Sequence, residues 1–360
     1  MDNSLALKYR PRTFEGVVGQ KAVSQLLKLM VDKGAVPRTV LMTGPKGCGK
    51  TSTARVLGAA LNCDLDEGAP CGSCPSCEAV FDGSSLDYRE IDASTNGLVG
   101  DIRRLQEELL YQTPGKCQVV VLDEAHGLSS AAANALLKTL EEAPEGVVFI
   151  LISTEPEKIM STIRSRCMTF QFRKVAPDVI ARRLYEVNQK ESTGVSNEVL
   201  IAIADRVDGA LRDGLMLLDQ IARAGISELS VFNSLFGQPD FAPDLISAMV
   251  SGNIVRAYEI LDDHIAITGN PSAVLNSVVV TLRDIMIIQG GGKTTLRASA
   301  LRSRTELANS VSSLKLMAAM RVLWDLKVKL RVGDDSTSAL SLAVSMMISV
   351  LADVKVLVEV

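Results

Sequence analysis

The sequence predicts a parallel α/β domain followed by helical domains. Short β-like runs alternate with helical stretches as far as residue 174. Helical patterns take over from residue 175, and almost no strand signal remains between residue 238 and Val360. A chain of 360 residues is also too long for one ordinary domain. We therefore expect three domains, at residues 1–174, 175–237 and 238–360.

The alternation in the first domain can be followed along the chain. Apolar runs bounded by turn residues predict strands at Val40–Thr43, Tyr88–Asp92, Gln118–Leu122 and Val147–Ser153. Helical spacing predicts helices at Ser52–Leu61, Gly100–Leu110 and Ala131–Glu142. Because strands that alternate with helices usually pair in parallel, we expect one sheet with helices on both faces.

The rest of the chain has the spacing of helices. The small second domain is expected to contain helices at Asp178–Gln189, Asn197–Val207 and Ala210–Ala224. The next boundary is expected at Gln238–Asp240, which has a proline at its centre. In the third domain Ser277–Ile288 is rich in Val and Ile, but its length favours a helix. Trp324 lies on a helical stretch and is expected in the core.

Composition narrows the class of protein. Hydrophobic residues make up 47% and charged residues 22%, which is typical of a folded chain. The net charge of −4 argues against a surface devoted to nucleic acid, although a local basic surface stays possible. Met1–Pro11 has no apolar core, so no signal peptide is predicted. Thr337–Ala352 is uncharged, but it falls short of the roughly 18–20 residues that span a bilayer. We expect a cytoplasmic protein without membrane contact.

A phosphate-binding loop follows the first predicted strand. The run from Gly44 to Thr51 reads G-P-K-G-C-G-K-T and matches G-x-x-x-x-G-K-[ST] between a strand and a helix. Its glycines let backbone N–H groups converge on a phosphate at a helix N-terminus. Lys50 is expected to reach the β- and γ-phosphates, and Thr51 to offer its hydroxyl to Mg²⁺. The residues expected to bind ATP are Gly44, Pro45, Gly47, Cys48, Gly49, Lys50, Thr51 and Ser52.

Two carboxylates end the apolar run Val119–Leu122. Asp123 is expected to hold Mg²⁺ through water, and Glu124 to polarise the attacking water. Alone, the pattern could equally be a strand with an acidic turn, but beside a phosphate-binding loop it favours ATP hydrolysis. His126 suits a hydrogen-bonding or switch role better than that of the base.

Four of the seven cysteines have the spacing of a metal site. Cys63, Cys71, Cys74 and Cys77 form C-x7-C-x2-C-x2-C within residues 62–80. Four thiolates leave no open coordination position, so we expect a structural zinc site rather than a catalytic one. The alternative is four unrelated reduced thiols. The segment favours a tight knuckle over a helix because it contains Gly68, Pro70, Gly72 and Pro75.

Several further motifs resemble those of clamp-loader ATPases of the AAA+ class. These are Tyr9–Phe14, Val18–Gln20, Asp123–His126, Asn134–Glu142 and Ser165–Cys167. The cysteine insert after the phosphate-binding loop is similar to that of the bacterial DNA polymerase III gamma/tau family. Together these motifs cover about residues 8–225.

The resemblance implies roles that spacing alone does not give. Thr154 corresponds to the first sensor of the γ-phosphate, and Arg212 to the second sensor, in a helical lid domain. Arg166 corresponds to an arginine finger that reaches the ATP of a neighbouring subunit. The residues that correspond to the adenosine-binding edge are Tyr9, Arg10, Pro11 and Val18.

The resemblance also implies partners. In the family, three such subunits form a five-membered ring with the delta and delta-prime subunits, held by a helical collar. The ring opens the β sliding clamp and closes it on primer–template DNA. The chain ends at Val360, without the long extension of the tau form, so only the clamp-loader core is expected. The alternatives are another AAA+ motor, such as a Holliday-junction branch migrator, and a non-catalytic scaffold like delta-prime.

Overall fold

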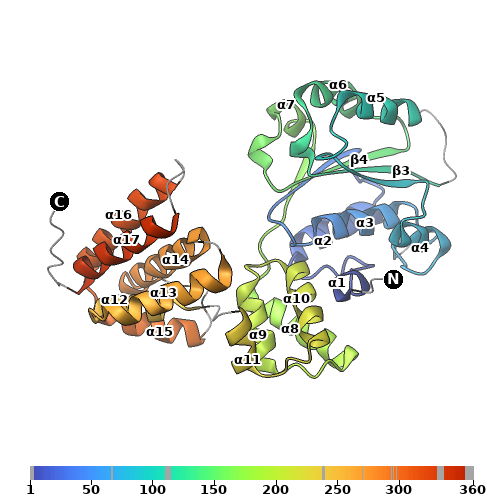
Figure 1. The fold of residues 1–360 in the computed structure, drawn as a ribbon. Coiled ribbons are helices and arrows are strands. Elements are labelled where there is room, and N and C mark those ends of the chain that lie inside the picture. Colours follow the sequence, from blue (N-terminus) through green and yellow to red (C-terminus); the bar gives the residue numbers. More distant parts are fainter. Residues whose placement is uncertain are drawn as a thin grey trace. The chain divides into compact units, whose positions relative to one another are not determined.

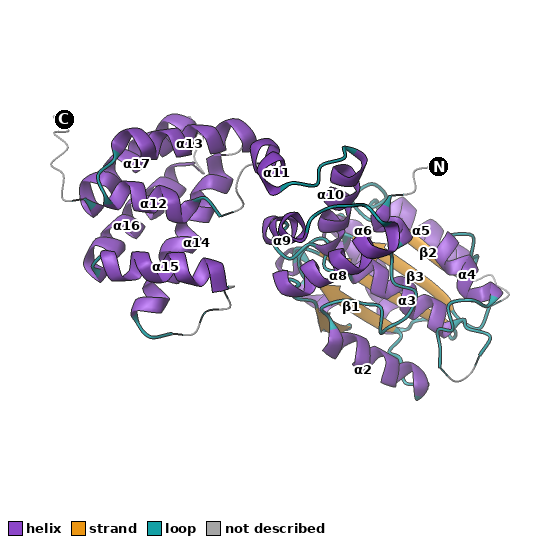
Figure 2. Ribbon diagram, turned by 90° about the horizontal axis from the view of Figure 1, so that it is seen from below, coloured by secondary structure: helices purple, strands orange, loops and turns teal. Residues whose placement is uncertain are grey.

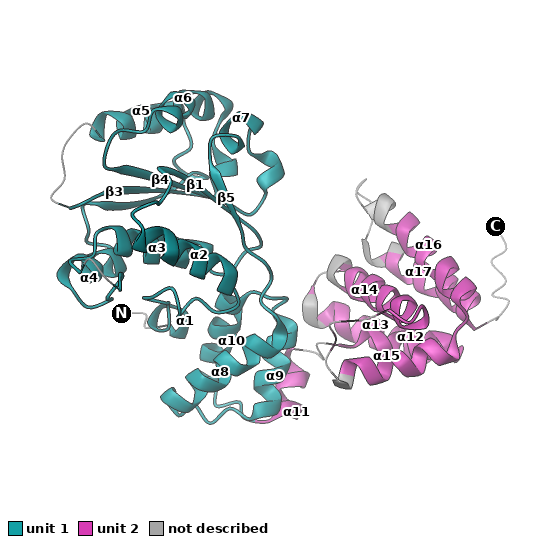
Figure 3. Ribbon diagram, turned by 180° about the vertical axis from the view of Figure 1, so that it is seen from behind, with its two compact units in different colours: residues 1–227 teal, residues 228–360 magenta. Residues whose placement is uncertain are grey.

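The chain forms two compact units. A computed structural model describes residues 4–65, 68–109, 115–236, 240–269, 271–292, 294, 296, 298–330 and 336–352. The first unit covers residues 1–227 and the second residues 228–360 (Figure 3). The boundary expected after residue 174 falls inside the first unit and stays a prediction. The Gln238–Asp240 boundary lies mostly outside the described residues.

A five-stranded parallel sheet organises the first unit. Its strands are β1 (Thr39–Thr43), β2 (Tyr88–Asp92), β3 (Gln118–Asp123), β4 (Val147–Ser153) and β5 (Met168–Gln171). All neighbouring pairs are parallel, in the order β2-β3-β4-β1-β5. The predicted parallel sheet is thus confirmed. Four of its strands were expected, and β5 was missed because it is short and mostly exposed.

Helices cover both faces of this sheet (Figure 1). One face carries α2 (Lys21–Asp32), α3 (Lys50–Leu61) and α4 (Pro75–Asp82), and the other carries α5 (Val99–Glu108), α6 (Ser130–Glu141) and α7 (Ser161–Arg164). Side chains alternate between two hydrophobic clusters: Val40 and Met42 join α3, whereas Leu41 joins α5 and α6. This alternation follows from the two-residue period of a strand.

The sheet order brings three chain segments to one edge. Strand β4 lies between β1 and β3 and pairs in parallel with both, so the carboxyl ends of all three strands lie at the same edge of the sheet. Strand β1 runs into the phosphate-binding loop, β3 ends at Asp123, and β4 ends just before Thr154. Proteins with an open α/β sheet bind ligands in the crevice at the carboxyl ends of their parallel strands.

The cysteine segment corrects one prediction. Helix α4 begins at Pro75, although prolines and glycines favoured a knuckle without a helix. Proline is tolerated at the first helical position because its missing N–H would have no partner there. The side chain of Cys74 also caps α4 by accepting a hydrogen bond from the amide of Cys77.

Helices α8 (Pro177–Glu191), α9 (Asn197–Arg206) and α10 (Leu211–Arg223) complete the first unit, and we call them the lid helices. The short α1 (Leu5–Lys8) contacts α10. Ser196 caps α9 by accepting a hydrogen bond from the amide of Val199. The helices expected in this part of the chain are all present.

The described part of the second unit is helical (Figure 2). Its helices are α11 (Leu229–Phe236), α12 (Ala242–Val250), α13 (Ile254–Thr268), α14 (Pro271–Gln289), α15 (Ala298–Ser310), α16 (Ser313–Leu330) and α17 (Ser336–Leu351). The Val- and Ile-rich run at 277–288 is a helix, as expected. Among the described helices, none combines the length and the apolarity needed to cross a membrane.

The prediction for Trp324 is wrong. Its side chain is 68% exposed, because the buried face of α16 is formed by Leu316, Ala319, Leu323 and Leu326. Trp324 follows Leu323 directly and therefore turns about 100° away from that face.

Candidate nucleotide site and metal centre

The glycines of the phosphate-binding loop lie where a side chain would not fit. Gly44 has φ 139°, and a Cβ there would be 2.4 Å from the carbonyl oxygen of Phe172. At Gly47, φ 73°, a Cβ would be 2.8 Å from the Cβ of Ala210, the residue before α10. Gly49 directly precedes α3 and has φ 107°, a backbone conformation that residues with a Cβ rarely adopt. The loop therefore requires these glycines for its shape.

Lys50, Thr51 and Asp123 meet beneath the loop. Lys50 Nζ donates to the carbonyl oxygens of Gly44 and Pro45, at 2.7 Å each. Thr51 Oγ1 donates to Asp123 Oδ2 at 2.8 Å. Burial lowers the pKa of Lys50 and raises that of Asp123, and the Thr51 bond opposes the second shift. An adjacent hydroxyl and carboxylate are hard oxygen donors, so the pair fits Mg²⁺.

Glu124 is held by the end of the neighbouring strand. Its Oε2 accepts hydrogen bonds from Thr154 Oγ1 at 2.9 Å and Thr154 N at 3.3 Å. His126 Nδ1 lies 3.4 Å from the same oxygen and 3.2 Å from Ser153 Oγ. His126 Nε2 lies 3.3 Å from Glu155 Oε1. The hydrogen-bonding role expected for His126 is supported by these contacts.

A cavity of about 290 Å³ opens above these residues. Its lining includes the expected adenosine edge, the loop from Lys46 to Ser52, both carboxylates, Thr154 and Arg212. Gly44 and Pro45 are not among the lining residues and act through the shape of the loop. The adenosine-edge residues that line it are Tyr9, Arg10, Pro11 and Val18.

The lid helices contribute side chains that the sequence did not single out. Arg183 from α8 and Leu215 and Met216 from α10 also line the cavity. Arg183 lies over the ring of Tyr9, 5.7 Å from its centroid. The Tyr9 hydroxyl donates to Glu191 Oε1 at 2.5 Å, and this bond raises the pKa of Tyr9. The N-terminal segment is thereby attached to α8 at the edge of the cavity.

Arg166 lies apart from this cavity. Its Nε donates to Glu141 Oε1 at 2.7 Å, and its Nη1 donates to the carbonyl oxygen of Thr162 at 2.7 Å. Its side chain is 31% exposed. Of the six residues expected to be catalytic, Arg166 is the one that does not line the chain's own cavity.

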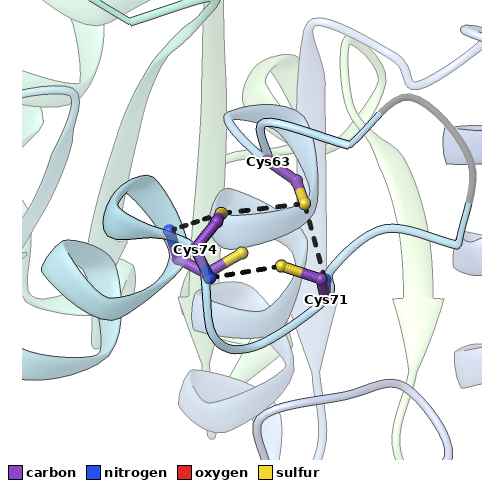
Figure 4. Close-up of side chains that lie close together, drawn as sticks. Cys63, Cys71 and Cys74 are labelled. Carbon is purple, nitrogen blue, oxygen red and sulfur yellow. Dashed lines mark hydrogen bonds between the residues drawn. The ribbon is translucent and has the colours of Figure 1, made fainter.

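The four cysteine thiols converge, and Figure 4 shows three of them, those of Cys63, Cys71 and Cys74. All four Sγ atoms lie within 4.8 Å of one another, and those of Cys63 and Cys74 are 4.0 Å apart. Tetrahedral zinc with bonds of about 2.3 Å needs sulfurs roughly 3.8 Å apart, so the set fits with a small contraction. Amides of Ser73 and Cys74 point at Cys71 and lower its pKa to about 6. Thiolate donors without an open position suit structural zinc.

Most of this chain is similar in sequence to known proteins. Residues 19–176 match the family described as DNA polymerase III, delta subunit. The chain is 38% identical over 265 residues to the DNA polymerase III subunit gamma/tau of Mycoplasma genitalium, covering 71% of this chain and 44% of the relative. It is 36% identical over 291 residues to the DNA polymerase III subunit tau of Escherichia coli, covering 79% of this chain and 45% of the relative. The chain belongs to the gamma/tau family of DNA polymerase III subunits. It spans about half the length of the curated relatives it matches.

This gamma/tau family member also has more distant structural neighbours. The Thermotoga maritima RuvB Holliday junction branch migration motor has a TM-score of 0.48 at 17% identity, covering 67% of this chain and 79% of that one. The Bacillus subtilis DNA clamp loader delta protein has a TM-score of 0.42 at 12% identity, covering 90% of this chain and 99% of that one.

Proposed function

We propose that this gamma/tau family member is an ATP-driven motor subunit of a clamp loader. It binds ATP, hydrolyses it, and uses the cycle to open the β sliding clamp and load it onto primed DNA. The observation that carries the proposal is the meeting of Thr51, Asp123, Glu124 and Thr154 at one edge of the sheet, in the lining of one cavity. This arrangement supports hydrolysis as well as binding.

Each residue has a task in this proposal. Lys50 leaves the loop carbonyls and binds the β- and γ-phosphates. Thr51 and Asp123 hold Mg²⁺, which would neutralise charge that develops on the phosphates. Glu124 orients and polarises the attacking water, and Thr154 contacts that water or the γ-phosphate. Arg212 reaches the phosphates from α10, while Tyr9, Arg10, Pro11 and Val18 surround the adenosine.

Arg166 acts on a neighbouring subunit. It lies outside its own cavity and is bound to Glu141, which supports action across an interface rather than in cis. Turnover by the isolated chain is therefore slow, because an arginine finger contributes on the order of 10³–10⁵ in rate. The implied assembly contains other copies of this chain together with the delta and delta-prime subunits, with residues 238–360 as the collar.

The remaining assignments follow from the same proposal. Cys63, Cys71, Cys74 and Cys77 hold zinc that stabilises the segment beside α3. Primer–template DNA is held through its phosphates, so its binding depends on salt and not on sequence. The protein acts in the cytoplasm, without membrane contact.

Two other functions predict different behaviour. A non-catalytic scaffold would not need the Glu124–Thr154 pair, and a branch migrator would act on four-way junctions. The test is a loading assay with labelled β clamp, the delta and delta-prime subunits and primed circular DNA. We expect ATP-dependent transfer of the clamp that is lost in Lys50→Ala. ATP turnover that responds to four-way junctions but moves no clamp would contradict the proposal.

A further inference from the structure

The buried amide of Gln20 joins the phosphate-binding loop to the segment that leads into the lid helices. Its Nε2 donates to the carbonyl oxygens of Arg173 at 2.7 Å and Cys48 at 3.3 Å. Its Oε1 accepts a hydrogen bond from Arg173 N at 3.2 Å. Gln20 is 4% exposed, and its amide pairs with all three of these backbone groups, as a buried amide must find partners within the fold.

Val18 and Gly19, which precede Gln20, lie against the nucleotide cavity and the segment before α8. Val18 lines the nucleotide cavity. Gly19 has φ 79°, and a Cβ there would be 2.7 Å from Cγ1 of Val175, two residues before α8. The three consecutive residues therefore touch the nucleotide cavity, the segment before α8 and the loop itself.

A second connection runs from the loop to α10. Arg212 N donates to the carbonyl oxygen of Gly47 at 3.4 Å. The segment before α8 is joined in turn to the segment before α10, because Val175 N donates to the carbonyl oxygen of Gly209 at 3.1 Å. Hydrogen bonds thus connect the loop through Gln20 to the segment before α8, that segment to the one before α10, and α10 back to the loop.

We infer that Gln20 is a positioning residue through which nucleotide in the loop sets the position of the lid helices. The inference rests on the proposed nucleotide binding. Lys50 Nζ is bound to the carbonyl oxygens of Gly44 and Pro45, and it must leave them to reach phosphate. The loop then changes its hydrogen bonds while Cys48 stays tied to Gln20. Because Gln20 also holds both backbone groups of Arg173, the change reaches the segment before α8 and alters where Arg212 lies.

Hydrogen exchange on the full chain tests this role. Wild type, Gln20→Met and the control Gln25→Met are compared with and without a non-hydrolysable ATP analogue. Gln25 is an exposed glutamine on α2, the helix that begins directly after Gln20, so the control makes the same chemical change away from the loop. In wild type and Gln25→Met we expect the analogue to slow exchange in residues 44–52, 171–176 and 208–216. In Gln20→Met only residues 44–52 are expected to keep this protection.

Affinity gives a second readout. We expect Gln20→Met to weaken binding of a fluorescent ATP by about 5- to 150-fold, the range of ordinary coupling between sites. If Gln20→Met does not fold, Gln20→Glu replaces it: this variant keeps the acceptor for Arg173 N but cannot donate to the carbonyl oxygens of Cys48 and Arg173. Full protection of residues 171–176 by the analogue in a folded Gln20 variant would overturn the inference. Absence of protection at residues 44–52 in wild type would instead overturn the nucleotide site itself.

Discussion

The hydroxyl of Thr154 donates a hydrogen bond of 2.9 Å to the carboxylate of Glu124. The two residues follow neighbouring strands, β4 and β3, and Glu124 lies in the left-handed region at φ 48°. A residue other than glycine rarely adopts that conformation, and its cost is of order 1–3 kcal/mol. The left-handed backbone and the hydrogen bond from Thr154 together place the carboxylate at the end of β3, in the lining of the cavity.

Replacing Glu124 should separate binding from hydrolysis. Glu124→Gln keeps the size of the side chain but removes the charge that polarises water. We expect ATP turnover by the assembled loader to fall by roughly 10²–10⁴, the usual contribution of a general base. Equilibrium binding of a fluorescent ATP should change little, because Lys50 and Thr51 are untouched. Equal losses of binding and turnover would show that Glu124 serves the site in another way.

Thr154 offers a finer test of the same pair. Thr154→Val has nearly the same shape but cannot donate to Glu124, whereas Thr154→Ser keeps the hydroxyl. We expect Thr154→Val to lower the turnover number by about tenfold or more, and Thr154→Ser to remain near wild type. Steady-state kinetics over a range of ATP concentrations measures both. If the two variants were equally slow, packing of the methyl group would matter more than the hydroxyl.

Arg166 should matter only in the assembly. Arg166→Ala is expected to leave the slow turnover of the isolated chain unchanged and to reduce that of the assembled loader by about 10³ or more. Arg164→Ala is the matched control, since Arg164 is an exposed arginine on the adjacent α7. The Arg166–Glu141 pair is half-exposed, so its loss should change the free energy of unfolding by at most about 1 kcal/mol. A large loss of turnover in the isolated chain would place Arg166 in its own active site.

The cysteine cluster predicts a metal content. The purified chain should hold about one zinc, measured by a colorimetric chelator, and Cys71→Ser or Cys74→Ser should release it and lower the melting temperature by several degrees. Cys167→Ser is the control, because Cys167 lies outside the cluster. Zinc retained in both cluster variants would refute the site.

A buried arginine should contribute to the stability of the second unit. Arg304 is 5% exposed, and its Nη1 and Nη2 donate to Asp240 at 2.7 Å and 2.9 Å, while its Nε lies 3.6 Å from Asp284 Oδ2. The Asp240 side chain is 39% exposed, whereas that of Asp284 is buried. Removing one partner of a buried pair costs about 3–5 kcal/mol, so Arg304→Met should lower the urea midpoint of the second unit strongly. Arg256→Met removes an exposed pair with Glu259 and should cost under about 1 kcal/mol. Similar small losses in both variants, followed by circular dichroism, would contradict this account.

The sequence predicted those parts of the site that depend on local geometry. The loop from Gly44 to Thr51 and the end of β3 have fixed spacings, because a backbone turn and a strand end dictate them. Arg183 and Met216 could not be found in this way, since they reach the cavity only through the tertiary arrangement of α8 and α10. No short motif accompanies either residue.

The errors also have physical reasons. Trp324 was expected in the core because it lies on a helix, but burial depends on which face of α16 meets its neighbours. The proline at residue 75 counted against a helix, yet the first helical position tolerates it. The contact of Gln20 with Arg173 joins segments far apart in the sequence, which local patterns do not encode.

The most direct test of the central claim is the ATP hydrolysis rate of the chain with the β clamp, the delta and delta-prime subunits and primed DNA, added singly and together. We predict strong stimulation by the complete set alone, lost in Lys50→Ala and in Arg166→Ala. A rate that is indifferent to the clamp and to primed DNA would contradict the claim that this chain is a clamp-loader motor.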